Sequence, residues 1–166
     1  VVTAKISISC YPTSVQPGGD VECSVASDTN LNNVGTVQFT IGTNSLFEFP
    51  RVSGLSITFN PITRQGTYSN PNGINFNAGQ TIFTISAHAL SGQGTTSVSF
   101  SWFVLRDAAS MNVINFGDLT TSNPITVGSV SSGRTCTESD WCNAWSNAAN
   151  NCGTRTCTVP AGAACT

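Results

Sequence analysis

Apolar and polar residues alternate through most of the first hundred positions, and this is the period of strands that bury one face. The alternation runs through 5–10, 20–25, 37–41, 46–49, 55–59 and 74–76, and Gly, Pro or Asn bounds each stretch. No apolar repeat of helical period lies between these stretches. Short strands separated by turn residues at this spacing predict an all-β protein built as an antiparallel sandwich.

Two further stretches predict a hairpin that closes the sandwich. One face of the first strand carries Phe83, Ile85, Ala87 and Ala89. One face of the second strand, after the turn at 92–94, carries Val98, Phe100, Trp102 and Val104. Simple alternation therefore puts Trp102 and Val104 on the same strand face as Phe100.

Residues 15–21 (VQPGGDV) before the second strand and 78–85 (AGQTIFTI), leading through Ala87 to Gly92 and a final strand, resemble the immunoglobulin-like domains of prokaryotic secreted and surface proteins. The resemblance covers roughly residues 4–105 and implies an immunoglobulin-like sandwich. If the strands at 5–10 and 21–25 pair, Cys10 lies opposite Cys23, within reach of a disulfide. Antibody-type domains have a cysteine near the sixth strand, which is absent here, so we assign Cys23 to Cys10.

The residue pattern changes at Arg106, after which Ser, Thr, Asn and Gly separate only short apolar stretches. We take 1–105 as the sandwich and 106–166 as a cysteine-rich extension packed on it. Short strands are expected at 111–116 and 125–130. One short helix is expected at 137–151, where Thr137 and Asp140 have capping-box spacing and Gly153 follows the last turn. Trp141 and Trp145 lie one turn apart on this helix, either as a seam against the sandwich or as a sugar-stacking platform.

Seven cysteines in so short a chain indicate an oxidising compartment. The late ones are Cys136, Cys142, Cys152, Cys157 and Cys165. They contain no Cys-x-x-Cys pair, so disulfides are favoured over a zinc site. Because seven is odd, one cysteine is left over. Cys165 bonded to another chain and a buried free thiol both remain open.

The charge pattern excludes some partners. Charged residues make up 8% of the chain, the net charge is −2, and Ser, Thr, Asn and Gly together account for 74 of the 166 residues. Six basic residues scattered singly cannot supply the field that nucleic acid requires. No apolar run reaches the roughly 20 residues of a membrane span. Because the seven cysteines indicate an oxidising compartment, the chain is expected outside the cell or at its surface.

Catalytic and metal-binding patterns are weak, and we expect neither an enzyme nor a cofactor. His88 is the one histidine and is expected on the solvated side of a strand, where no nucleophile is paired with a base. The run 28–33 has oxygen-bearing side chains, but it lacks the glycine and the bidentate Glu of a calcium loop, and an Asn-rich turn explains it equally well. Alternation points Lys5 outward, away from the dry core that an isopeptide bond needs.

Two functions from different classes remain. A surface with so few ions can be covered by a neighbouring copy without desolvating charges, so the first is a structural subunit of an extracellular filament, pilus-like appendage or other homopolymer. Its joint would be strand addition by Val1, Val2, Thr3 and Ala4. The alternative is an adhesive or carbohydrate-binding module of a larger secreted protein, with a glycan as its ligand.

Overall fold

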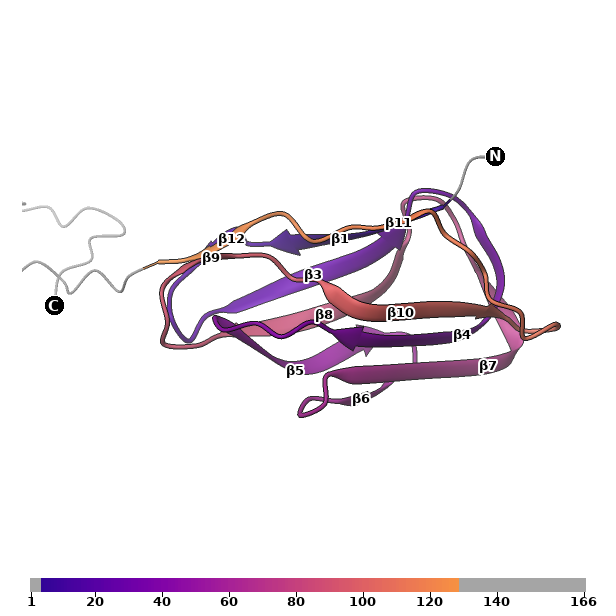
Figure 1. The fold of residues 1–166 in the computed structure, drawn as a ribbon, viewed down its shortest axis with the longest axis horizontal. Helices are drawn as coiled ribbons and strands as arrows, with labels where there is room; N and C mark the ends of the chain where they lie inside the picture. Colours follow the sequence, from indigo (N-terminus) through magenta and orange to yellow (C-terminus); the bar gives the residue numbers. More distant parts are fainter. Residues whose placement is uncertain (1–3, 129–166) are drawn as a thin grey trace, which may run out of the picture. The chain divides into compact units, whose positions relative to one another are not determined.

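The computed structural model describes residues 4–128, which form a sandwich of β-strands (Figure 1). The strands are β1 (Lys5–Tyr11), β2 (Ser14–Val15), β3 (Asp20–Ser27), β4 (Leu31–Ile41), β5 (Phe47–Gly54), β6 (Thr58–Asn60), β7 (Gln65–Phe76), β8 (Thr81–Ala89), β9 (Gly94–Thr96), β10 (Phe100–Asp107), β11 (Asp118–Leu119) and β12 (Ile125–Val127). The expected all-β sandwich is confirmed. The expected helix at 137–151 and the five late cysteines lie outside the described residues.

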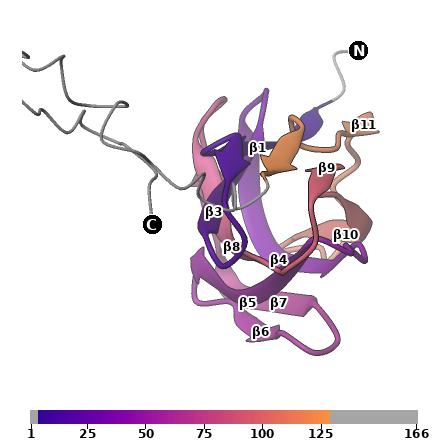
Figure 2. The same ribbon diagram turned by 90° about the vertical axis from the view of Figure 1, so that its left-hand side faces the viewer.

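Two main sheets face each other (Figure 2). One has the strand order β11-β1-β3-β8-β5 and the other β10-β4-β7-β6, while a small third sheet has the order β2-β12-β9. Alternate residues of the long strands point between the main sheets, as the period of 2 requires. The resulting core contains Val25, Phe83 and Ile85 from the first sheet, and Val37 and Phe39 from the second, all at most 1% exposed.

Phenylalanine rings form the centre of this core. The Phe39 ring stacks on that of Phe83 with centroids 4.7 Å apart, and the Phe100 and Phe103 rings lie 5.0 Å apart. Phe116 packs edge-on against Phe103 at 5.6 Å, from the segment that follows β10. Aromatic rings at these separations add to the free energy gained by burying their area.

The compact unit extends to Gly128, past the predicted boundary at residue 105. The strand expected at 111–116 is reduced to one bridge between Val113 and Arg106. Instead, β11 pairs with β1 and β12 pairs with β2 and β9, and Ile125 and Val127 are buried. The alternation at 125–127 is therefore a strand as expected, and it completes the sandwich.

The predicted pattern also missed most of β7, of which only 74–76 was expected to be strand. Residues 65–73 show no apolar alternation, because the inward positions are held by Gly66 and Tyr68. A Cβ at Gly66 would lie 2.2 Å from Cζ of Phe39, so the glycine makes room for that ring. Here a residue that usually marks a turn is a core position of a long strand.

Candidate functional site

The predicted Cys10–Cys23 disulfide is present, and its two residues are opposite each other in the pairing of β1 with β3. Both cysteines are buried, at 3% and 0% exposure. Of the four residues predicted to form a subunit joint, only Ala4 is described. Its carbonyl accepts a hydrogen bond from the Gly117 amide at 2.6 Å, so its backbone already takes part in the protein's own fold. Val1, Val2 and Thr3 lie outside the described residues, and the joint stays a prediction.

The outer face of the five-stranded sheet carries a band of charge. Glu22, Ser86 and Arg51 stand in one row across β3, β8 and β5, and Asp20, His88 and Glu48 stand in the next. The Ser86 hydroxyl donates to Glu22 at 2.8 Å and accepts from Nε of Arg51 at 3.0 Å. Nδ1 of His88 lies 2.7 Å from Oδ1 of Asp20. This network holds the charged side chains against the sheet.

The same network shows that His88 is not hydrogen-bonded to Ser86 as the base of a serine nucleophile would be. A serine nucleophile would need its hydroxyl bonded to the base, but the Ser86 hydroxyl donates to Glu22 while His88 is bonded to Asp20. His88 is half-buried on the outer face, close to the expected solvated position. Among residues 4–128, no group of three or more His, Cys, Asp or Glu side chains is placed to hold a metal ion.

The run at 28–33 serves structure. Oδ1 of Asp28 accepts from the Lys5 amide at 2.7 Å, and Oδ1 of Asn30 accepts from the Ala78 amide at 2.8 Å. Nδ2 of Asn33 donates to Asp107 at 2.9 Å. The Asp28 and Asn30 oxygens are occupied by backbone donors and the Asn33 amide binds Asp107, which is the structural role of an Asn-rich turn.

The outer face of the four-stranded sheet is different in kind. Its outward residues are mostly uncharged amides and hydroxyls, and Arg106 at one corner is the one ionic side chain among them. We call this surface the four-stranded face; by rows it consists of Trp102, Thr40, Gln65 and Asn60, then Val104, Gln38, Thr67 and Thr58, then Arg106, Thr36 and Ser69. A partner can cover such a surface without removing many charges from water.

Trp102 is the large apolar residue of this face, and the prediction that it shares a strand face with Phe100 is wrong. It is 49% exposed, whereas Phe100, Phe103 and Leu105 are buried. The cause is an irregularity of β10: the register shifts between Phe100 and Trp102, so the side chains after it change faces. Trp102 and Val104 consequently point outward, away from the strand face of Phe100 on which simple alternation puts them.

A second apolar residue, Ile62, projects at the tip between β6 and β7 and is 86% exposed. The tip is rigidly bonded. Oδ1 of Asn60 accepts from the amides of Ile62 at 2.9 Å and Thr63 at 3.2 Å. Arg64 adopts φ 58°, and its Nε donates to the Ile41 carbonyl at 3.1 Å. An isoleucine is thus held out in water by a preformed turn.

Shallow hollows lie on both sides of this tip. One, of about 590 Å³, is lined by the β6 and β7 residues of the four-stranded face together with Phe59, Pro61 and Thr63. The other, of about 430 Å³, lies between Pro50 and Ile62. Both are open rather than enclosed, so they fit projecting side chains of a partner better than a buried small molecule.

The outer edges of the two main sheets are poor sites for adding a strand. The edge strand β5 contains Pro50 and a register shift between Glu48 and Arg51, and both interrupt a ladder. The edge strands β6 and β11 are three and two residues long. Part of the outer edge of β10 is occupied, because Ile114 donates to Leu105 and Asp107 donates to Asn112. Faces are therefore better candidates for contact than edges.

Comparisons with known proteins identify the fold. No family model and no curated protein matches the sequence. Solved structures do match, and cohesin modules are among them. The cohesin module of a Clostridium perfringens family 33 glycoside hydrolase gives a TM-score of 0.61 at 10% identity, covering 78% of this chain and 99% of that one. Residues 4–128 contain no helix long and apolar enough to cross a membrane.

Two further cohesins each cover about three quarters of the chain. A cohesin of Clostridium thermocellum, solved in a type I cohesin–dockerin complex, gives a TM-score of 0.57 at 16% identity and covers 74% of this chain and 99% of its own. A non-cellulosomal cohesin of the archaeon Archaeoglobus fulgidus gives 0.57 at 14%, covering 74% and 91%. At these identities the likeness shows the fold of the sandwich and nothing more.

Proposed function

We propose that this chain is a non-catalytic recognition module of an extracellular or cell-surface assembly, and that it binds a protein partner on the four-stranded face. The observation that carries the proposal is the combination on that face of half-exposed Trp102 with uncharged amide and hydroxyl side chains. Cohesin structures with the same fold include complexes with dockerins, which supports a protein as the partner.

Trp102 and Ile62 are the expected anchors. Tryptophan is enriched among residues whose truncation weakens binding most, because a large rigid ring buries much area at little entropic cost. Ile62 needs no ordering before it is buried, because the Asn60 side chain already fixes its turn. The amides and hydroxyls of β4 and β7 between them would form the polar part of the contact.

Extracellular location is supported by the Cys10–Cys23 disulfide, since cytosolic thiols are kept reduced. Of the two functions that the sequence left open, the comparisons support the binding module better than the filament. The partner is then a different protein rather than further copies of this chain. A binding module could instead take a glycan that stacks on Trp102. The experiment below distinguishes a glycan ligand from a protein partner.

The test uses light-induced crosslinking in the organism's extracellular fraction. A photoreactive amino acid replaces Gln38, at the middle of the four-stranded face, and in a matched variant it replaces Ser24 on the opposite sheet. We expect a protein to be captured specifically at position 38. That protein is then purified, and its affinity is measured for wild type, Trp102→Ala and the control Glu48→Gln.

Trp102→Ala should weaken the complex by roughly 30-fold or more, about 2 kcal/mol, while Glu48→Gln leaves the affinity unchanged. The affinity should change little when salt is raised about tenfold, because few charges are covered. Equal capture at both positions, or an affinity indifferent to Trp102→Ala, would contradict the proposal. Binding to a glycan array that is lost in Trp102→Ala would instead identify a carbohydrate ligand.

A further inference from the structure

The first and last segments of the described sandwich run side by side in the same direction. β1 pairs parallel with β11, matching Lys5 with Asp118 and Ile6 with Leu119, and β2 pairs parallel with β12. The start of β1 and the end of β12 lie at opposite ends of the sandwich (Figure 1). A force that separates residue 4 from residue 128 therefore slides the two segments along each other.

Backbone hydrogen bonds join the two segments at both of their ends. We call these bonds the terminal ladder: Gly117 N–H to the Ala4 carbonyl at 2.6 Å, Thr120 N–H to Ile6 at 3.0 Å, Thr126 N–H to Thr13 at 2.9 Å and Gly128 N–H to Val15 at 2.8 Å. Between the two strand pairs the backbones separate, and a side chain takes the place of a backbone partner.

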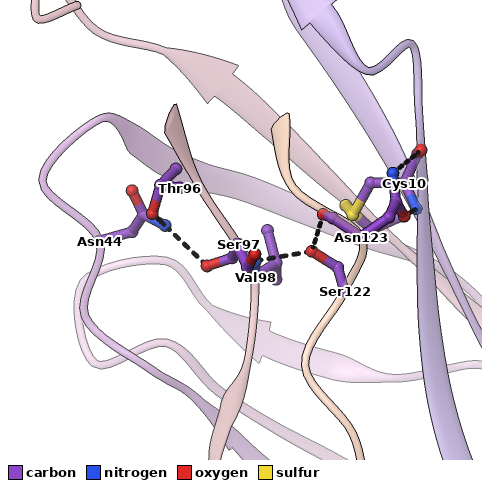
Figure 3. Close-up of a disulfide and its surroundings, with 8 residues drawn as sticks. Cys10, Asn44, Thr96, Ser97, Val98, Ser122 and Asn123 are labelled. Carbon is purple, nitrogen blue, oxygen red and sulfur yellow. Dashed lines mark hydrogen bonds between the residues drawn. A yellow bond between two sulfur atoms is a disulfide. The ribbon is translucent and has the colours of Figure 1, made fainter. Parts of the chain in front are cut away.

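That side chain is Asn123. Its Oδ1 accepts from the Cys10 amide at 2.8 Å, and its Nδ2 donates to the Cys10 carbonyl at 3.0 Å, so one carboxamide pairs both backbone groups of one residue (Figure 3). Both bonds link residues separated by 113 positions in the chain. Asn123 thus continues the terminal ladder across the gap between β11 and β12.

Each side of the terminal ladder is also fixed to the body of the sandwich at its centre. On the first side, the disulfide joins Cys10 to Cys23 of β3. On the second side, Ser122 exchanges bonds with Val98, with the Val98 amide donating to Oγ and the Ser122 amide donating to the Val98 carbonyl, both at 2.8 Å (Figure 3). A load that reaches Cys10 or Asn123 is therefore shared with other strands.

We propose that the sandwich is a load-bearing module, which carries tension between its first and last strands through the terminal ladder, with Asn123 and the Cys10–Cys23 disulfide at its centre. When parallel segments are pulled from opposite ends, their hydrogen bonds must be strained together, whereas a peeled pair loses them one at a time. The force needed is set by the barrier to unfolding and not by the free energy of unfolding. This function is independent of the proposed partner.

The test pulls the full chain from its two ends in a single-molecule force experiment. Rupture of the sandwich is recognised by a gain in contour length of roughly 350 Å, which is the extended length of residues 4–128 less the loop closed by the disulfide and less the folded distance between the two ends. The variants are Asn123→Ala and the milder Asn123→Asp, which retains the acceptor and loses the donor. The control is Val37→Ala, a truncation of a fully buried β4 residue outside the terminal ladder. Urea unfolding of all three gives their equilibrium stabilities.

We expect both Asn123 variants to rupture at clearly lower force than Val37→Ala, even where urea shows equal or smaller destabilisation. In a Cys10→Ala, Cys23→Ala variant the contour-length gain should rise by about 45 Å, the loop of 13 residues being released, and the rupture force should fall. Rupture forces that follow urea stability across all variants, or Asn123 variants as strong as wild type, would overturn the proposal.

Discussion

Single carboxylates can anchor a loop, and Asp107 does so at the end of β10. Oδ1 accepts from the Ser110 amide at 2.8 Å, from its hydroxyl at 2.9 Å and from the Ala109 amide at 3.0 Å. Oδ2 accepts from Asn33 at 2.9 Å, which ties the loop to the start of β4. The Ser110 amide and then the Asn33 side chain lower the pKa of Asp107 below its ordinary value, because both favour the charged form.

This shift gives a pH-dependent prediction. A carboxyl group whose pKa is lower in the folded state adds stability above its unfolded pKa, and that stability is lost as pH falls through the folded value. Asp107→Asn should therefore lower the urea midpoint at about pH 7, and the difference from wild type should shrink below about pH 4. Ser110→Ala, which removes one donor, should show a smaller version of the same effect. A difference that is as large at about pH 2.5 as at neutrality would refute this origin.

Trp102 shows where residue-level prediction fails. Residues 100–105 are apolar at both parities except for Ser101, so alternation alone cannot say which set faces inward. The shift of register at Ser101 decides it, and its cause lies in the pairing with β4 rather than in local sequence. Ile62 was passed over because an isoleucine inside a turn has no periodic signal. Both candidate anchors were therefore invisible in the sequence.

Pairs of strands were easier to predict, and β1 with β3 is the clearest case. Both strands alternate cleanly, so the facing of Cys10 and Cys23 followed from the pattern, and the structure confirms it. By contrast, β7 escaped because Gly66 replaces an apolar side chain at an inward position. Strands whose inward residues are apolar can be predicted from sequence, while a strand that accommodates a neighbour's ring cannot.

The Cys10–Cys23 disulfide should stabilise the pair of β1 and β3. Replacing both cysteines, Cys10→Ala with Cys23→Ala, should lower the free energy of unfolding by about 3 kcal/mol, because the unfolded chain regains the entropy of a closed loop. Alanine is chosen since both sites are buried and a hydroxyl there would lack a partner. Urea unfolding measures the change. An unchanged midpoint would mean that β1 is held by its hydrogen bonds alone.

The two outer faces of the sandwich differ in how much charge they carry. Asp20, Glu22, Glu48 and Arg51 share the five-stranded sheet with His88, while the four-stranded face keeps only Arg106. Composition revealed that ions were scarce but could not show where they gather, because that depends on which strands become neighbours. A small desolvation cost on binding is therefore expected for the four-stranded face alone. One such face suits a single partner better than the stacking of copies on both sides.

The compact unit of the described residues runs to Gly128, beyond the residues of β10. A chain shortened to 1–128 keeps every strand of the sandwich, whereas one shortened to 1–105 loses β11, β12 and Asn123. Burying Ile125 and Val127 is worth roughly 1.5–3 kcal/mol each, a large part of the 5–15 kcal/mol that stabilises a typical domain. The shorter chain also leaves the Val98 amide, which donates to Ser122 inside the protein, without its partner.

We therefore expect residues 1–128 to unfold cooperatively in urea and to give dispersed amide NMR spectra, and residues 1–105 to do neither. A control chain of 1–128 carrying Ile125→Ala and Val127→Ala separates burial from chain length. It should fold with reduced stability, because the hydrogen bonds of Asn123 and Ser122 remain. If residues 1–105 instead unfolded at the same urea midpoint as 1–128, the final segment would be an appendage, and tension applied at residue 128 would not reach the core.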